Sequence, residues 1–127
     1  MKLKVVVADD NAAVLTEIAS LLESEFEVVA RAQDGKSALE CIQRFQPDVV
    51  VLDLGMPVLN GIELSRKISK MSPRPAIVIC SVESDPEIVE AAHRAGALGY
   101  VFKPSMNRDL IDAVKAAANG EFFRSST

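Results

Sequence analysis

The sequence predicts a single α/β domain built on a parallel β-sheet with helices on both faces. Strand-like runs of β-branched residues alternate five times with helix-like stretches along the 127 residues. With right-handed crossovers, this alternation makes the strands parallel and places helices on both sides of the sheet. The run Val49 to Leu52 is apolar throughout, which is typical of a central strand covered on both faces. The chain length suits one hydrophobic core and leaves no room for a second domain.

The first predicted strand, Leu3 to Ala8, is a β-branched run that stops at two acids, Asp9 and Asp10. Asn11 can cap the helix that follows. The apolar positions of this helix recur at helical spacing: Val14, Leu15, Ile18, Leu21 and Leu22. The second strand, Glu27 to Ala32, is more polar, which suits a sheet edge.

Asp34-Gly35 turns the chain into a second helix, and Pro47 separates this helix from the third strand. That strand, Val49 to Leu52, is too short to span a membrane and too β-branched to prefer a helix. It ends at Asp53. In open α/β sheets ligands bind beyond the carboxyl ends of the strands, so this acid is a candidate site residue. From this stretch alone, a helix-capping or turn acid is a competing interpretation.

After Pro57, a loop containing Asn60-Gly61 leads into a third helix, which a Ser-Pro-Arg-Pro sequence at 72–75 breaks. The fourth strand, Ala76 to Cys80, ends at Ser81. This serine is a further polar side chain at the carboxyl end of a predicted strand.

Asp85-Pro86 combines a capping residue with a first-turn proline and opens the fourth helix, which Gly96 terminates. The fifth strand, Gly99 to Phe102, leads directly into Lys103-Pro104. The last helix is predicted over 106–119, followed by a short tail.

The composition is that of an ordinary soluble globule, with 49% hydrophobic and 25% charged residues. No apolar run approaches the roughly 20 residues of a membrane-spanning helix, so we expect no membrane contact. The amino terminus lacks the features of a signal peptide, and a cytoplasmic protein is expected. Cys41 and Cys80 lie in apolar patterns, which favours reduced, buried thiols. A net charge of −4 argues against nucleic-acid contact by this segment.

Five polar side chains follow the last apolar residues of four predicted strands: Asp9, Asp10, Asp53, Ser81 and Lys103. A parallel sheet brings these strand ends to one rim, so the five side chains are expected to converge. Three carboxylates within a few ångströms repel one another by several kcal/mol per pair near a protein surface. One Mg²⁺ and one lysine would supply three positive charges. Oxygen ligands without a nearby histidine or cysteine favour Mg²⁺ over zinc.

Four motifs stand in order along the chain: VVVADD, VVVLDLGMPVLNG, IVICS and AGALGYVFKP. Together they resemble the receiver domain of bacterial response regulators in two-component signalling, and the resemblance extends over nearly the whole chain. The resemblance implies a flavodoxin-like fold, a doubly wound five-stranded parallel sheet of order 2-1-3-4-5 with five helices. It assigns residues 1–120 to the receiver domain. Residues 121–127 would be a C-terminal tail or the start of a linker, since the ending ANGEFF resembles the junction to a helix-turn-helix output domain.

The resemblance also implies roles for the site residues. Asp53 would be the phosphoacceptor, attacking a phosphohistidine on a sensor histidine kinase or phosphotransfer protein. Asp10 and Asp53 would ligate Mg²⁺ directly, with the Gly55 carbonyl as third ligand and Asp9 acting through a metal-bound water. Lys103 would pair with a phosphoryl oxygen and stabilise the charge that develops during transfer.

Ser81 would donate a hydrogen bond to the new phosphoryl group and draw the following loop inward. In this family that movement frees space for Tyr100 to swing inward, which alters the face formed by the fourth helix, fifth strand and fifth helix. Pro104 matches the position of a cis Lys-Pro bond, although only about 5–6% of X-Pro bonds are cis. The chain would therefore be a phosphoryl acceptor, with slow self-dephosphorylation, rather than an enzyme. The resemblance also allows a homodimer.

The expected function is control of transcription through a C-terminal DNA-binding domain absent from this chain. A stand-alone receiver acting by protein–protein contact or in a phosphorelay is the alternative. A phosphohydrolase of the haloacid dehalogenase type is less favoured, because Asp53-Leu54-Gly55 lacks the second acid of its DxD motif. A flavin or nucleotide binder is disfavoured by the acidic, glycine-free turn ADDNAAV. His93 is expected to be a solvated helix residue.

Overall fold

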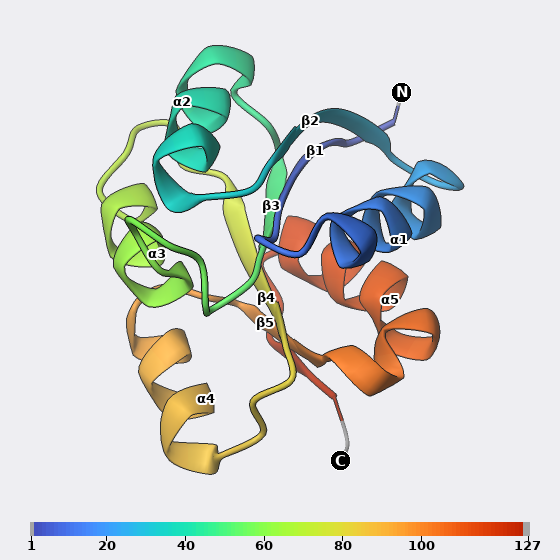
Figure 1. The fold of residues 1–127 in the computed structure, drawn as a ribbon, viewed down its shortest axis with the longest axis vertical. Helices are drawn as coiled ribbons and strands as arrows, with labels where there is room; N and C mark the ends of the chain where they lie inside the picture. Colours follow the sequence, from blue (N-terminus) through green and yellow to red (C-terminus); the bar gives the residue numbers. More distant parts are fainter. Residues whose placement is uncertain (1, 126–127) are drawn as a thin grey trace.

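The fold is a parallel sheet between two layers of helices (Figure 1). The structure is a computed structural model that describes residues 2–125. Within these residues the sheet has six strands in the order β2-β1-β3-β4-β5-β6. The elements, in chain order, are β1 (Lys4–Ala8), α1 (Ala12–Glu23), β2 (Glu27–Ala32), α2 (Gly35–Phe45), β3 (Val49–Leu52), α3 (Gly61–Ile68), β4 (Ala76–Ser81), α4 (Pro86–Arg94), β5 (Gly99–Phe102), the 3-10 turn η1 (Lys103–Ser105), α5 (Met106–Ala118) and β6 (Phe123–Arg124).

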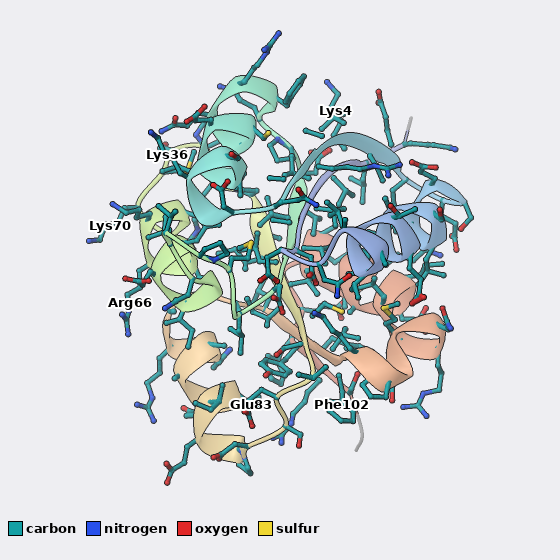
Figure 2. All side chains as sticks on the ribbon, in the orientation of Figure 1. Lys4, Lys36, Arg66, Lys70, Glu83 and Phe102 are labelled. Atoms are coloured by element: carbon teal, nitrogen blue, oxygen red, sulfur yellow. The ribbon has the colours of Figure 1, made fainter. Side chains whose placement is uncertain are left out.

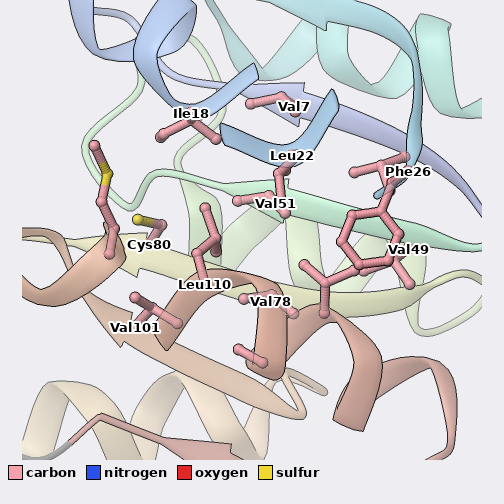
Figure 3. Packing of buried hydrophobic residues seen from close by; sticks show 14 of the residues in the cluster. Val7, Ile18, Leu22, Phe26, Val49, Val51, Val78, Cys80, Val101 and Leu110 are labelled. Carbon is pink, nitrogen blue, oxygen red and sulfur yellow. The ribbon is translucent and has the colours of Figure 1, made fainter. Parts of the chain in front are cut away.

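Successive residues of the central strands point to opposite helical layers, as the two-residue period of a β-strand requires. Val5 and Val7 belong to a core cluster shared with α1 and α5, which Figure 3 shows from close by. Val6 and Ala8 belong to a second cluster shared with α2, α3 and α4. All four residues of β3 are buried. The prediction of a sheet covered on both faces is therefore confirmed.

The five predicted strands and their order 2-1-3-4-5 are confirmed, and β6 is an addition that the sequence did not reveal. β6 pairs with β5 in parallel, with Phe123 opposite Gly99 and Arg124 opposite Tyr100. Part of the expected tail therefore continues the sheet at its β5 edge.

Polar side chains cap the helices that follow β1, β2 and β3. The Asn11 side chain accepts hydrogen bonds from the first turn of α1, at 3.0 and 3.1 Å. Asp34 accepts from the Ser37 amide at 2.7 Å, and Asn60 forms a reciprocal capping box with Glu63. Each cap is worth about 1 kcal/mol. Because each of these helices begins beyond the carboxyl end of its strand, the residues between strand and helix lie at the carboxyl rim of the sheet.

The two cysteines differ in burial. Both are free cysteines, but only Cys80 is buried as expected, whereas Cys41 is partly exposed. Burial raises the pKa of the Cys80 thiol to about 12, so this side chain stays protonated and packs as an apolar residue (Figure 3). Among residues 2–125, no helix combines the length and apolar character needed to cross a membrane.

Candidate functional site

The five polar residues predicted to converge do meet at the carboxyl rim of the sheet. Asp10, Asp53, Ser81 and Lys103 line a pocket of about 490 Å³. Asp9 is fully buried beside this pocket, in contact with Lys103. The parallel topology places these side chains together, because each follows the carboxyl end of its own strand.

Lys103 bridges two of the acids. Its Nζ lies 2.7 Å from Asp9 Oδ2 and donates a hydrogen bond to Asp53 Oδ1 at 3.1 Å. Burial alone would lower the pKa of Lys103, but its interactions with the two carboxylates outweigh burial and raise that pKa. The lysine therefore stays charged and offsets part of the negative charge at the rim.

One lysine does not balance three acids, and their arrangement suits a cation. Carboxylate oxygens of Asp9, Asp10 and Asp53 all lie within 4.8 Å of one another. Asp9 Oδ2 is buried and makes no hydrogen bond within residues 2–125, where its approach to Lys103 is an ion pair without hydrogen-bonding geometry. Hard cations such as Mg²⁺ prefer oxygen ligands of this kind. The residues present therefore fit a divalent metal ion.

The backbone of Asp53 is held from two sides. Its amide donates to Ala8 O at 3.0 Å, which ties it to the end of β1. On the other side α3 begins so close that a Cβ added at Gly61 would lie 2.5 Å from Asp53 O. The Gly61 amide also donates to Leu54 O at 3.0 Å. Gly61 is thus a positioning residue that sequence reasoning treated only as part of a turn.

The loop from Gly55 to Asn60 is shaped by a strained turn. Val58 has φ +71°, and the Leu59 amide donates to Pro57 O at 2.8 Å, which closes a three-residue γ-turn. A β-branched residue rarely adopts this conformation. Earlier in the loop, a Cβ added at Gly55 would lie 3.7 Å from Asp53 Oδ2. The Gly55 backbone therefore runs beside the Asp53 carboxylate, which is compatible with the ligand role expected for its carbonyl.

Ser81 and Tyr100 meet at the loop after β4. The Ser81 Oγ accepts a hydrogen bond from the Glu83 amide at 3.1 Å. The Tyr100 hydroxyl donates to the Glu83 carbonyl at 2.6 Å, and only 4% of Tyr100 is exposed. Burial raises the pKa of Tyr100. The tyrosine thus already occupies the inward position to which it was expected to swing, and its response to phosphorylation stays a prediction.

The prediction of a cis peptide bond between Lys103 and Pro104 was wrong. Within the described residues, the cis peptide bond lies at Ser72-Pro73. Lys103–Ser105 forms the 3-10 turn η1, in which Pro104 occupies the first turn and the Met106 amide donates back to Lys103 O. A trans proline suits the start of a helical turn because its φ is already near the helical value. The Lys103 side chain reaches both acids from this turn.

Asp53 has a raised pKa, which makes the metal-free site a source of instability at neutral pH. Burial of the carboxylate raises the pKa, the hydrogen bond from Lys103 opposes the rise, and the charges of Asp9 and Asp10 add to it. An acid whose pKa is higher in the folded chain than in the unfolded chain contributes stability while it is protonated. This contribution is fully present below its unfolded-state pKa. That contribution is lost as the pH rises through the folded-state pKa.

We therefore expect Asp53→Asn to increase the free energy of unfolding of the metal-free chain at neutral pH, by on the order of 1 kcal/mol. The advantage over the wild type should shrink as the pH falls toward the ordinary carboxyl pKa, where Asp53 becomes neutral. Urea unfolding in the presence of a chelator, repeated over a series of pH values, measures both effects. A variant less stable than the wild type at neutral pH would refute this account of the Asp53 charge.

Comparison with known proteins identifies the family of this chain. The family model of the response regulator receiver domain matches residues 5–115. The transcriptional regulatory protein DegU of Brevibacillus brevis is 35% identical over 94% of this chain and 51% of its own length. The chemotaxis protein CheY of Halobacterium salinarum is 32% identical over 90% of this chain and 95% of its own length.

A solved receiver-domain structure has the same fold as this chain. The signal receiver domain of the response regulator NarL from Mycobacterium tuberculosis has a TM-score of 0.88 to this structure at 32% identity. The match covers 94% of this chain and 98% of that domain. This chain spans about half the length of DegU. The sheet, the acidic rim and these matches together establish that the chain belongs to the receiver-domain family of two-component response regulators.

Proposed function

We propose that the chain is a phosphorylatable switch and that Asp53 accepts its phosphoryl group. The main supporting observation is the position of the Asp53 carboxylate. It lines the pocket, lies within 4.8 Å of two further acids, and accepts a hydrogen bond from Lys103 at 3.1 Å. A phosphoryl group placed on this carboxylate would have a cation and a hydroxyl, from Lys103 and Ser81, in the same pocket.

In the proposed reaction a carboxylate oxygen of Asp53 attacks the phosphorus of a phosphohistidine on a partner kinase or phosphotransfer protein. The new O–P bond forms as the P–N bond breaks, and the histidine nitrogen keeps that electron pair. Lys103 Nζ would turn from the acids toward a phosphoryl oxygen, and Ser81 Oγ would donate to another. The product is an aspartyl phosphate.

The acidic cluster would hold the required metal ion. Asp10 and Asp53 would bind it directly, Gly55 would contribute its carbonyl, and Asp9 would act through a water molecule. Mg²⁺ in this position would neutralise charge on the equatorial oxygens during transfer. Gly55 offers no side chain to orient water two residues after Asp53, so self-dephosphorylation should be slow.

For the output, we propose regulation of transcription through a DNA-binding segment outside this chain. DegU, a transcriptional regulatory protein, and NreC, an oxygen regulatory protein of Staphylococcus epidermidis, match 94% and 95% of the chain but only 51% and 57% of their own lengths. The match to CheY over 95% of its length favours a second candidate, a stand-alone receiver acting through protein contacts. The cytoplasmic location is part of either proposal.

The proposal predicts metal-dependent phosphorylation of this chain. Incubation with acetyl phosphate and Mg²⁺ should increase the intact mass by one phosphoryl group, because a small acyl phosphate can replace the protein donor. Removal of the metal with a chelator should prevent the increase, since the three carboxylates then repel the incoming phosphate. Intact mass spectrometry with and without the chelator measures this. No increase with Mg²⁺, or an equal increase in chelator, would disprove the proposal.

A further inference from the structure

A basic surface lies on α3 and the loop that follows it. Residues 61–75 contain four basic residues, Arg66, Lys67, Lys70 and Arg74, and a single acid, Glu63, so this stretch carries a net charge of +3. All four basic residues are exposed. The chain as a whole carries a net charge of −4, which argues against nucleic-acid contact. That average hides the local excess of positive charge on α3.

The packing of α3 turns the basic surface toward solvent. Leu64 and Ile68 are fully buried in the core cluster that α3 shares with α2 and α4. Arg66 stands two residues from each of them, so the period of 3.6 residues per turn places it on the opposite side of the helix. Lys67 and Lys70 are also exposed. In Figure 2, Arg66 and Lys70 lie on the same side of the molecule.

Within residues 2–125, no acid forms an ion pair with the four side chains of the basic surface. The ion pairs of this part of the chain use other basic residues: Arg31, Arg94, Lys103, Arg108 and Lys115. Glu63 precedes Lys67 by one helical turn, but its Oε1 accepts a hydrogen bond from the Asn60 amide at 3.1 Å in the capping box. The acid nearest in sequence is therefore engaged at the other end of α3.

Arg74 joins the basic surface from the loop after α3. One terminal nitrogen of its guanidinium donates to Ser69 O at 3.2 Å, which holds the group beside the end of the helix. A guanidinium has five N–H donors, so donors remain for a ligand. Because the group is already held, a contact with a ligand costs less side-chain entropy. The helix dipole accounts for the placement of Arg66 and Lys67, which lie in the last turn of α3, but not for Lys70 beyond it.

We propose that the basic surface of α3 contacts the phosphate backbone of duplex DNA beside the site bound by the DNA-binding segment of the regulator. The inference rests on the transcriptional part of the proposed function. Duplex DNA carries one negative charge per about 1.7 Å of its axis, which a cluster of unpaired cations complements. Contacts to phosphates carry no sequence information, but they fix the orientation of a protein on the duplex. The contact would therefore orient the receiver domain relative to the bound DNA.

Four phosphate contacts bind weakly by themselves, and a tethered domain needs no more than that. Each contact gains affinity by releasing counterions from the duplex. A DNA-binding segment joined to the receiver by a short linker would hold it beside the duplex at an effective concentration on the order of millimolar. The relatives DegU and NreC extend well beyond the region that this chain matches, which leaves room for such a segment.

The salt dependence of DNA binding tests this inference. The 127-residue chain is titrated against a fluorescent duplex of arbitrary sequence, and anisotropy gives the binding constant at several salt concentrations. A plot of log binding constant against log salt concentration should have a slope of about −3.6, the value for four phosphate contacts. Lys70→Ala should reduce the magnitude of this slope by about 0.9, and Arg66→Ala with Lys70→Ala by about 1.8. Lys70→Arg, which keeps the charge, should keep the slope. The duplex should also shift the amide NMR signals of Lys67 and Lys70.

Lys115→Ala is the matched control, because it removes one lysine charge from α5, where Lys115 pairs with Glu25. Its slope should equal that of the wild type. Absence of binding at about 20 mM salt, where screening is weak, overturns the inference, and so does a wild-type slope in the double variant. Equally tight binding to polyglutamate or to phosphatidylserine vesicles would assign the basic surface to an acidic protein or a membrane and overturn it as well.

The titration requires no phosphoryl group, so it fails or succeeds independently of the switch. A chain that acetyl phosphate phosphorylates but that does not bind the duplex refutes this inference alone. A chain that binds the duplex through the basic surface but is never phosphorylated supports the inference and refutes the role proposed for Asp53.

Discussion

Replacing Asp53 with asparagine is expected to abolish phosphorylation of the chain. The amide keeps the size of the side chain but offers no anionic oxygen to attack phosphorus. It also removes one of the three carboxylates grouped within 4.8 Å, which weakens the metal site. Radiolabelled phosphate transferred from acetyl phosphate in the presence of Mg²⁺ measures the loss, and the variant should remain at background.

Asp48→Asn is the matched control for this substitution. Asp48 precedes β3, whereas Asp53 follows it, so the two acids lie at opposite ends of one strand. Asp48 accepts a hydrogen bond from the Lys4 amide at 2.8 Å, which an asparagine oxygen can also accept. The control should incorporate label like the wild type. Incorporation in Asp53→Asn at more than background level would show that another residue is the acceptor.

Lys103→Ala is expected to slow phosphoryl transfer by about 100- to 1000-fold, the usual cost of losing one charge-stabilising donor. The Nζ of this lysine lies 2.7 Å from an Asp9 oxygen and 3.1 Å from an Asp53 oxygen. From this position its positive charge can interact with the negative charge that develops on the phosphoryl group. Initial rates of labelling at saturating Mg²⁺ provide the measurement, and circular dichroism checks that the variant is folded.

Lys115→Ala serves as the control for loss of a lysine. Lys115 pairs with Glu25 at 2.6 Å on the surface, where the lysine side chain is 50% exposed. Exposed ion pairs contribute about 0–1 kcal/mol, so this variant should retain both fold and labelling rate. Equal labelling rates in Lys103→Ala and the wild type would rule out the role given to Lys103. Unfolding of Lys103→Ala would instead show that the lysine is mainly structural.

The sequence was most informative where burial and polarity change abruptly. The run Val49 to Leu52 is buried throughout, and the first residue that breaks its apolar pattern is Asp53. The same break marks Asp9 and Ser81. Because parallel strands share a carboxyl edge, these breaks predict a common site without any knowledge of side-chain contacts. This is why the five site residues could be grouped from the sequence.

The sequence was least informative where single contacts decide the structure. β6 has only two residues, and the bond from Ser125 to Asp109 joins positions that no local pattern relates. The 2.5 Å approach at Gly61 was also hidden, although Asn60-Gly61 marked a turn there. The Pro104 expectation came from the family alone, and the 3-10 turn at Lys103–Ser105 accommodates a trans bond instead.

Locating the phosphoryl group tests the central claim most directly. Borohydride reduces an aspartyl phosphate to homoserine and releases phosphate, so the acceptor can be identified by peptide mass spectrometry. After treatment with acetyl phosphate and Mg²⁺, homoserine should be found at position 53 and be absent from samples treated in chelator. Homoserine at position 9 or 10, a phosphate on His93, or an unmodified chain would contradict the account.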